Sequence, residues 1–75
     1  MTTLCEELSA EYAERSRTES DPQAAAQFAV AAAITAAMAA FAIEMRLGLE
    51  RSRAVDAIEH LAESVGLLSG VFPAG

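Results

Sequence analysis

The stretch Pro22–Ile43, PQAAAQFAVAAAITAAMAAFAI, carries no charged side chain. Twelve of the twenty residues from Ala24 to Ile43 are alanine, the strongest helix former, and no glycine interrupts the run. The larger apolar side chains are distributed around the helix instead of forming one stripe. Because a helix that is apolar on every side has to be buried on every side, this stretch predicts the central helix of a small all-α bundle.

The rest of the chain supplies two shorter helices and completes one domain, residues 1–75. The predicted helices cover about 3–17, 22–47 and 50–65, and an apolar C-terminal tail covers 67–75. Thr3 and Glu6 have the spacing of a capping box, in which the Thr side chain accepts a hydrogen bond from the backbone three residues later. The sequence therefore predicts that Thr3 caps the start of the first helix.

The ends of the second and third helices are less sharply marked. The second helix begins either with Ser20 and Gln23 as a capping box, or with Asp21 as the cap and Pro22 at the first helical position. A break is favoured from Gly48 to Arg51, because glycine inside a helix costs about 1 kcal/mol relative to alanine. A continuous helix through Gly48 is the alternative. Gly66 is expected to end the third helix.

Two short helices cannot cover every side of the alanine-rich helix, so we expect a second copy of the chain to cover the remainder. The commonest arrangement for such a pair is a two-fold homodimer. The residues expected at this dimer interface are the large apolar ones of the central segment: Phe28, Ile34, Met38, Phe41 and Met45.

The charge of the chain restricts the classes of partner. Eleven acidic residues oppose five arginines, which gives a formal charge of −6 and no lysine. Nucleic acid is therefore not an expected partner, because general affinity for its phosphate backbone needs clustered basic residues. Cys5 is the only cysteine, so no disulfide can form within the chain, and a reduced cytoplasmic setting is expected. A transmembrane helix at 24–43 is the less favoured alternative, because alanine is close to neutral for insertion.

Two polar clusters were considered as ligand sites. Asp56, His60 and Glu63 share one helix face and are weak candidates for a metal site, since imidazole and carboxylate groups ligate divalent metals. Arg46, Arg51 and Arg53 gather at the predicted turn and are candidates for binding a small anion. The competing interpretations are a solvated acidic face and ion pairs with neighbouring glutamates. No cofactor and no catalytic activity are expected, because the one Cys and the one His lie in different elements.

Part of the third helix also resembles one half of a winged helix-turn-helix DNA-binding domain. The matching elements are Leu47-Gly48-Leu49 as the turn, Arg51-Ser52-Arg53-Ala54 at the start of a recognition-type helix, then Ala57-Ile58, Leu61 and Gly66-Leu67-Leu68. The resemblance implies a DNA-binding regulator. Against it, Asp56, Glu59 and Glu63 on the same helix would repel phosphate.

The function expected from the sequence is binding to another protein, as a regulator, an adaptor or an inhibitor, a class that includes phage-encoded inhibitors of host proteins. The residues expected to bind that protein are the apolar ones beyond the predicted third helix, because closely grouped exposed apolar residues mark interaction surfaces. They are Leu67, Leu68, Val71 and Phe72. The alternatives are a helix-turn-helix regulator and an oligomer that binds a small ligand or a metal.

Overall fold

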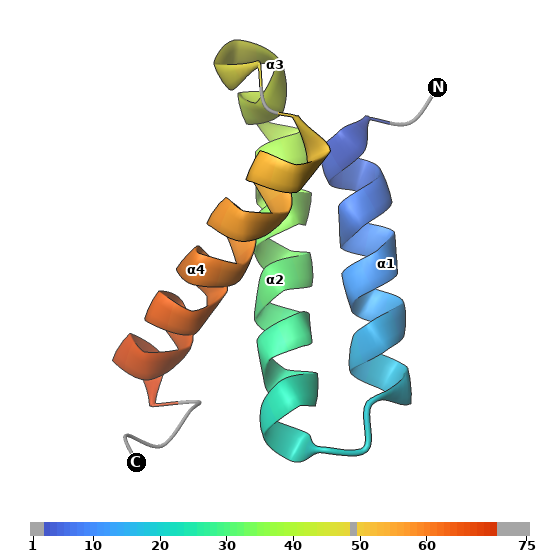
Figure 1. The fold of residues 1–75 in the computed structure, drawn as a ribbon, viewed down its shortest axis with the longest axis vertical. Coiled ribbons are helices and arrows are strands. Elements are labelled where there is room, and N and C mark those ends of the chain that lie inside the picture. Colours follow the sequence, from blue (N-terminus) through green and yellow to red (C-terminus); the bar gives the residue numbers. More distant parts are fainter. Residues whose placement is uncertain (1–2, 49, 71–75) are drawn as a thin grey trace.

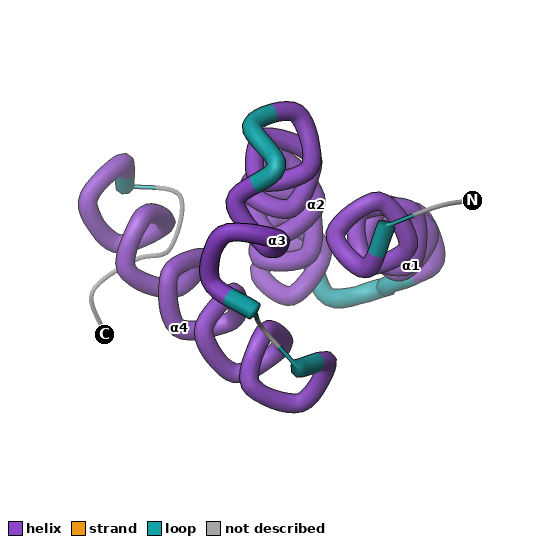
Figure 2. Tube along the Cα trace, turned by 90° about the horizontal axis from the view of Figure 1, so that it is seen from above, coloured by secondary structure: helices purple, strands orange, loops and turns teal. Residues whose placement is uncertain are grey.

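The computed structural model describes residues 3–48 and 50–70, and all regular structure within them is helical. Four helices follow one another in the order α1 (Leu4–Thr18), α2 (Pro22–Ala40), α3 (Ile43–Leu47) and α4 (Arg51–Ser69). The all-α prediction is confirmed. Helices α1 and α2 run antiparallel, side by side, whereas α4 crosses α2 and diverges from it toward the C-terminal end (Figure 1). Viewed from above, α1 and α4 cover two sides of α2 and leave its remaining side without a covering helix (Figure 2).

Local capping residues set the beginnings of the first two helices. The Thr3 side chain accepts a hydrogen bond from the Glu6 backbone N–H at 3.2 Å, as predicted. Of the two predicted starts for α2, the structure has the second: Asp21 Oδ1 accepts from the Gln23 backbone N–H at 3.2 Å, and Pro22 occupies the first turn. These bonds satisfy backbone donors that a helix start leaves without an intrahelical partner.

The predicted helix 22–47 is wrong at its C-terminal end. Helix α2 ends at Ala40, and Ala42 has a positive φ of 53°, which separates α2 from the short helix α3. A non-glycine residue in this region is strained by about 1–2 kcal/mol, because Cβ approaches the following carbonyl oxygen. The bend turns the chain so that α4 can return along α2, and packing of α4 against α2 offsets the strain.

Glycines shape both ends of α4, but only one of them as predicted. Gly48 has a positive φ of 60° and separates α3 from α4. The favoured break between helices is therefore confirmed, and the alternative of a continuous helix through Gly48 is wrong. Gly66 does not end the helix, because α4 continues to Ser69 and closes at Gly70 with φ 75°. Gly66 is buried and lies four residues beyond Ala62, on the side of α4 that packs against α2.

The core lies where α1, α2 and α4 meet. Its buried members are Leu8, Tyr12, Ala31, Ala54, Ile58 and Ala62, with Cys5 also buried. Tyr12 stacks on Phe28 with ring centroids 6.3 Å apart, and the Arg15 guanidinium lies 5.9 Å from the Phe28 ring centroid. Two serines of α1 also donate to the α2 backbone: Ser9 Oγ to the Ala32 carbonyl at 3.2 Å, and Ser16 Oγ to the Ala25 carbonyl at 3.1 Å. Alanine at both acceptor positions leaves these carbonyls accessible.

Candidate interaction surfaces

One side of α2 is exposed and consists of alanine alone. Only Ala31 and Thr35 are buried in this helix. Thr35 satisfies its hydroxyl within α2 by donating to the Ala31 carbonyl at 2.9 Å, so no polar group interrupts the apolar surface. We refer to the exposed residues that share the side left uncovered by α1 and α4 as the alanine face: Ala29, Ala33, Ala36, Ala37 and Ala40. Their spacing of three and four residues aligns them along the helix.

The residues predicted for dimer contacts divide into two groups. Phe28, Ile34 and Met38 are half-buried and pack against the chain's own core. Phe41 and Met45 are 69% and 76% exposed, at the bend and in α3. The large side chains of α2 thus face the protein's interior, whereas the interface residues predicted from the sequence were chosen for their size.

A second apolar surface lies on α4, next to the residues that pack against α2. Leu61 and Val65 are 47% and 43% exposed, and we refer to them as the α4 flank. Glu59 lies on the side of α4 toward α1, close enough to Tyr12 to raise the pKa of its hydroxyl. At 100° per residue, Leu61 lies about 200° round the helix from Glu59. Leu61 therefore lies on the side of α4 away from Glu59 and α1.

Two of the four residues predicted to bind another protein, Leu67 and Leu68, lie in the last turn of α4. Leu67 and Leu68 are helical, not part of an extended tail, and Leu68 is 90% exposed. We refer to these two leucines as the α4 tip. Val71 and Phe72 lie outside the described residues.

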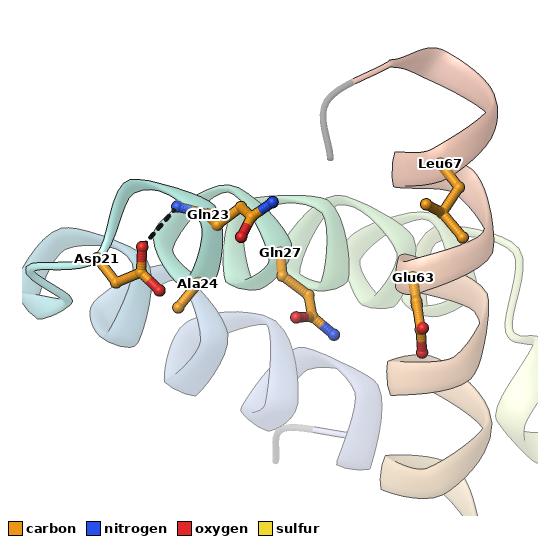
Figure 3. A pocket seen from close by; sticks show the side chains of 6 residues that line it. All are labelled: Asp21, Gln23, Ala24, Gln27, Glu63 and Leu67. Carbon is orange, nitrogen blue, oxygen red and sulfur yellow. Dashed lines mark hydrogen bonds between the residues drawn. The ribbon is translucent and has the colours of Figure 1, made fainter. Parts of the chain in front are cut away.

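An open cleft of about 380 Å³ lies where α4 diverges from the start of α2 (Figure 3). Its lining residues are Asp21, Gln23, Ala24, Gln27, Glu63 and Leu67. Two carboxylates and two amides make it polar and acidic, and Leu67 of the α4 tip forms one edge. All six side chains are exposed or half-buried, so the cleft is a wide surface depression and not an enclosed ligand pocket.

One of the three arginines predicted to form an anion site, Arg51, is engaged in an ion pair. Arg51 Nη2 contacts both carboxylate oxygens of Glu11 in α1, at 2.7 and 2.9 Å, and this hydrogen bonding raises the pKa of Arg51 above its usual value. Both partners are about half exposed, so the pair contributes little to stability. Arg46 and Arg53 are exposed. The glutamate that engages Arg51 comes from a different helix, not from the neighbouring positions considered in the sequence.

The weak metal candidates are not assembled into a site. Asp56, His60 and Glu63 are all exposed on α4. Within residues 3–48 and 50–70, no three His, Cys, Asp or Glu side chains gather where they could hold a metal ion. A shared helix face did not bring these groups close enough.

Helix α2, with 19 residues and a mean hydropathy of 1.4 over an 18-residue window, is also long and apolar enough to cross a membrane. Length and composition are weak grounds, since the central helix of a soluble bundle meets the same criterion. We found no match to the chain among protein families, curated proteins or solved structures.

Proposed function

We propose that the protein is a small acidic cytoplasmic homodimer that acts by binding another protein, as a regulator, an adaptor or an inhibitor. The observation that carries this proposal is the uncovered side of α2. Five alanines are exposed there with no charge between Pro22 and Ile43, beside the half-exposed apolar α4 flank. Continuous apolar surface of this kind on a small soluble domain favours association with protein.

Dimerisation and binding to another protein are assigned to separate surfaces in this proposal. The alanine face and the α4 flank suit the dimer contact, because both are apolar and because small residues let helix axes approach to the short end of about 8–10 Å. The α4 tip lies at the far end of α4 and is available to another protein. Leu68 projects almost entirely into solvent, as residues that anchor helix-mediated contacts do.

The alternatives have weaker support. A helix-turn-helix regulator would need Arg46, Arg51 and Arg53 together on one exposed surface, but Arg51 pairs with Glu11. A small-ligand site would need an enclosed pocket, and the cleft in Figure 3 is open. Neither alternative accounts for the exposed apolar surface of α2.

The dimer is tested by light scattering of the purified chain at micromolar concentration, with Ala33→Leu compared against Ala10→Leu. Both alanines are exposed and helical in the single chain, so leucine is nearly neutral at either position in a monomer. In a close-packed interface, overpacking costs about 1–3 kcal/mol, which weakens association about 5- to 150-fold. We expect dimers for the wild type and Ala10→Leu, and weakened dimers for Ala33→Leu. A folded wild-type monomer would contradict the proposal.

Binding to another protein is tested by affinity purification from the native host with two variants of α4. Leu68→Asp places a charge in the α4 tip, whereas Asp56→Asn alters an exposed residue elsewhere on the same helix. We expect a specific protein to co-purify with the wild type and Asp56→Asn and to be lost with Leu68→Asp. Retention of the same protein by Leu68→Asp would remove the α4 tip from the binding site. Absence of any specific protein would count against the proposed function.

A further inference from the structure

We infer that the second copy docks antiparallel, with its α2 lying along α2 of the first copy and the two-fold axis passing between Ala33 and Ala36. This inference rests on the proposed homodimer and specifies which surface the second copy covers and in which direction its helices run. The occupant is thus a second copy of this chain, seated on the alanine face and the α4 flank.

The first argument is the area that a dimer has to cover. Helix α2 has 19 residues and is about 28 Å long, so a strip about 10 Å wide along it offers only about 280 Å². Interfaces of standard size bury about 800 Å² on each partner. The alanine face alone is too small, and the contact has to extend onto exposed apolar side chains beside it. Those that adjoin α2 are Leu61 and Val65 of α4 and Phe41 at the bend.

The second argument is charge. Each copy carries a charge of −6, and two such copies repel each other wherever acidic surfaces meet. The longest stretch of sequence without charge is Pro22–Ile43, which forms α2 and the bend after it. Two copies therefore approach each other with least repulsion along their α2 helices.

The third argument fixes the direction. The turn before α2 carries Glu19 and Asp21, whereas the segment 44–53 after it holds three arginines and two glutamates. A parallel dimer would place the two acidic turns side by side, well within the screening length of about 8 Å at physiological salt. An antiparallel dimer sets each acidic turn near exposed Arg46 of the other copy. The opposed helix dipoles add a further favourable term.

The antiparallel arrangement also pairs apolar groups from opposite ends of the molecule. Phe41 is exposed at the C-terminal end of α2, and Val65 lies between Glu63 and Leu67, which line the cleft at the start of α2. An antiparallel copy brings its Phe41 toward that half. The interface then continues from the alanine face onto the α4 flank in both copies.

The register gives a direct test with single cysteines. Ala29 and Ala40 lie on opposite sides of the proposed axis and are 11 residues apart, about 16 Å along the helix. A disulfide needs Cα atoms about 4.4–6.8 Å apart. In the antiparallel dimer, Ala29→Cys faces Ala40→Cys of the other copy and not its own equivalent. In a parallel dimer, each cysteine faces its own equivalent.

The experiment oxidises Ala29→Cys, Ala40→Cys and a refolded mixture of the two, one of them carrying a mass tag, after light scattering of each sample. We expect a shift to the mixed dimer mass in the mixture and no such shift in either variant alone. Ala10→Cys on the exposed surface of α1, and the wild type with its buried Cys5, are the controls and should not cross-link.

The other outcomes separate this inference from the proposed function. Dimers by light scattering with each variant cross-linking to itself would establish a parallel pair and overturn the antiparallel one. Dimers without any cross-link would place the interface elsewhere. Either result leaves the homodimer intact and removes only the inferred arrangement. Monomers in every sample would refute the homodimer and the arrangement together.

Discussion

Replacing Tyr12 by phenylalanine should stabilise the protein. Tyr12 is 1% exposed, and its hydroxyl has no hydrogen-bond partner within residues 3–48 and 50–70. Protein mutational data put the cost of a buried polar group without a hydrogen bond at about 1–3 kcal/mol. Tyr12→Phe removes this group but keeps the ring that stacks on Phe28, so the free energy of unfolding should rise by about 1 kcal/mol or more.

The assay is urea and thermal unfolding of the wild type and Tyr12→Phe at equal protein concentration. For a domain of this size, each kcal/mol shifts the thermal midpoint by about 4–8 °C. Tyr12→Ala is the matched control for the ring and should lose about 3–5 kcal/mol. A destabilised Tyr12→Phe would show that the hydroxyl has a partner, such as a bound water, and would refute the reasoning.

The same pair of proteins should diverge further in alkali. Burial, and then the nearby Glu59 carboxylate, raise the pKa of Tyr12 above 10.0 in the folded chain. Above pH 10 the unfolded chain releases the phenolic proton more readily than the folded one, so the wild type loses stability as pH rises. Phenylalanine has no such proton, so the advantage of Tyr12→Phe should widen between about pH 9 and 11. A constant difference across this range would show that the pKa is not raised.

Three other predictions concern the core, the bend after α2 and the ion pair between α1 and α4. Ile58→Ala should lower the free energy of unfolding in urea by about 2–5 kcal/mol, because Ile58 is fully buried. Ile58→Val should lower it by about 0.5–1.5 kcal/mol. Equal effects of the two substitutions would show that Ile58 is not closely packed in the core. Ala42→Gly should gain about 1 kcal/mol in the same assay by relieving the positive φ. Ala10→Gly in the middle of α1 should lose about as much, and destabilisation by both would contradict the bend. Glu11→Gln should lower the thermal midpoint slightly, and less in high salt, by removing the exposed ion pair with Arg51; an effect insensitive to salt would contradict that assignment.

Local chemistry explains what the sequence predicted correctly. Thr3 and Asp21 cap their helices through bonds to residues two or three positions away, so a short window of sequence contains all the information. The break at Gly48 follows from the same kind of argument, because glycine adopts a positive φ without strain.

The features that were missed depend on contacts distant in the sequence. Nothing local predicts a bend at Ala42, since alanine favours a continuous helix. The bend exists because α4 returns to pack against α2. In the same way the helix continues through Gly66 to Ser69 and ends at Gly70, whose φ is 75°. The sequence showed that α2 has no polar side, but which side stays uncovered depends on where α1 and α4 lie.

Helices α1 and α4 are packed on α2 to different extents, and this difference bears on the uncovered side of α2. Helix α1 is held to α2 by the stacked Tyr12 and Phe28 rings and by serine bonds to the α2 backbone. Helix α4 buries two alanines and only one large side chain, Ile58. Because alanine contributes little buried apolar area, α4 is the more weakly held of the two.

In the inferred dimer, a second copy seated on the alanine face also touches the α4 flank, because the alanine face alone is too small for a stable contact. The contact that covers α2 would then also stabilise the packing of α4 against the core. Burial of Leu61 and Val65 by the second copy would supply the apolar area that Ala54 and Ala62 do not. In this arrangement α4 links the two roles of the protein. Its flank completes the dimer, and that contact fixes the helix whose tip presents Leu68 to another protein.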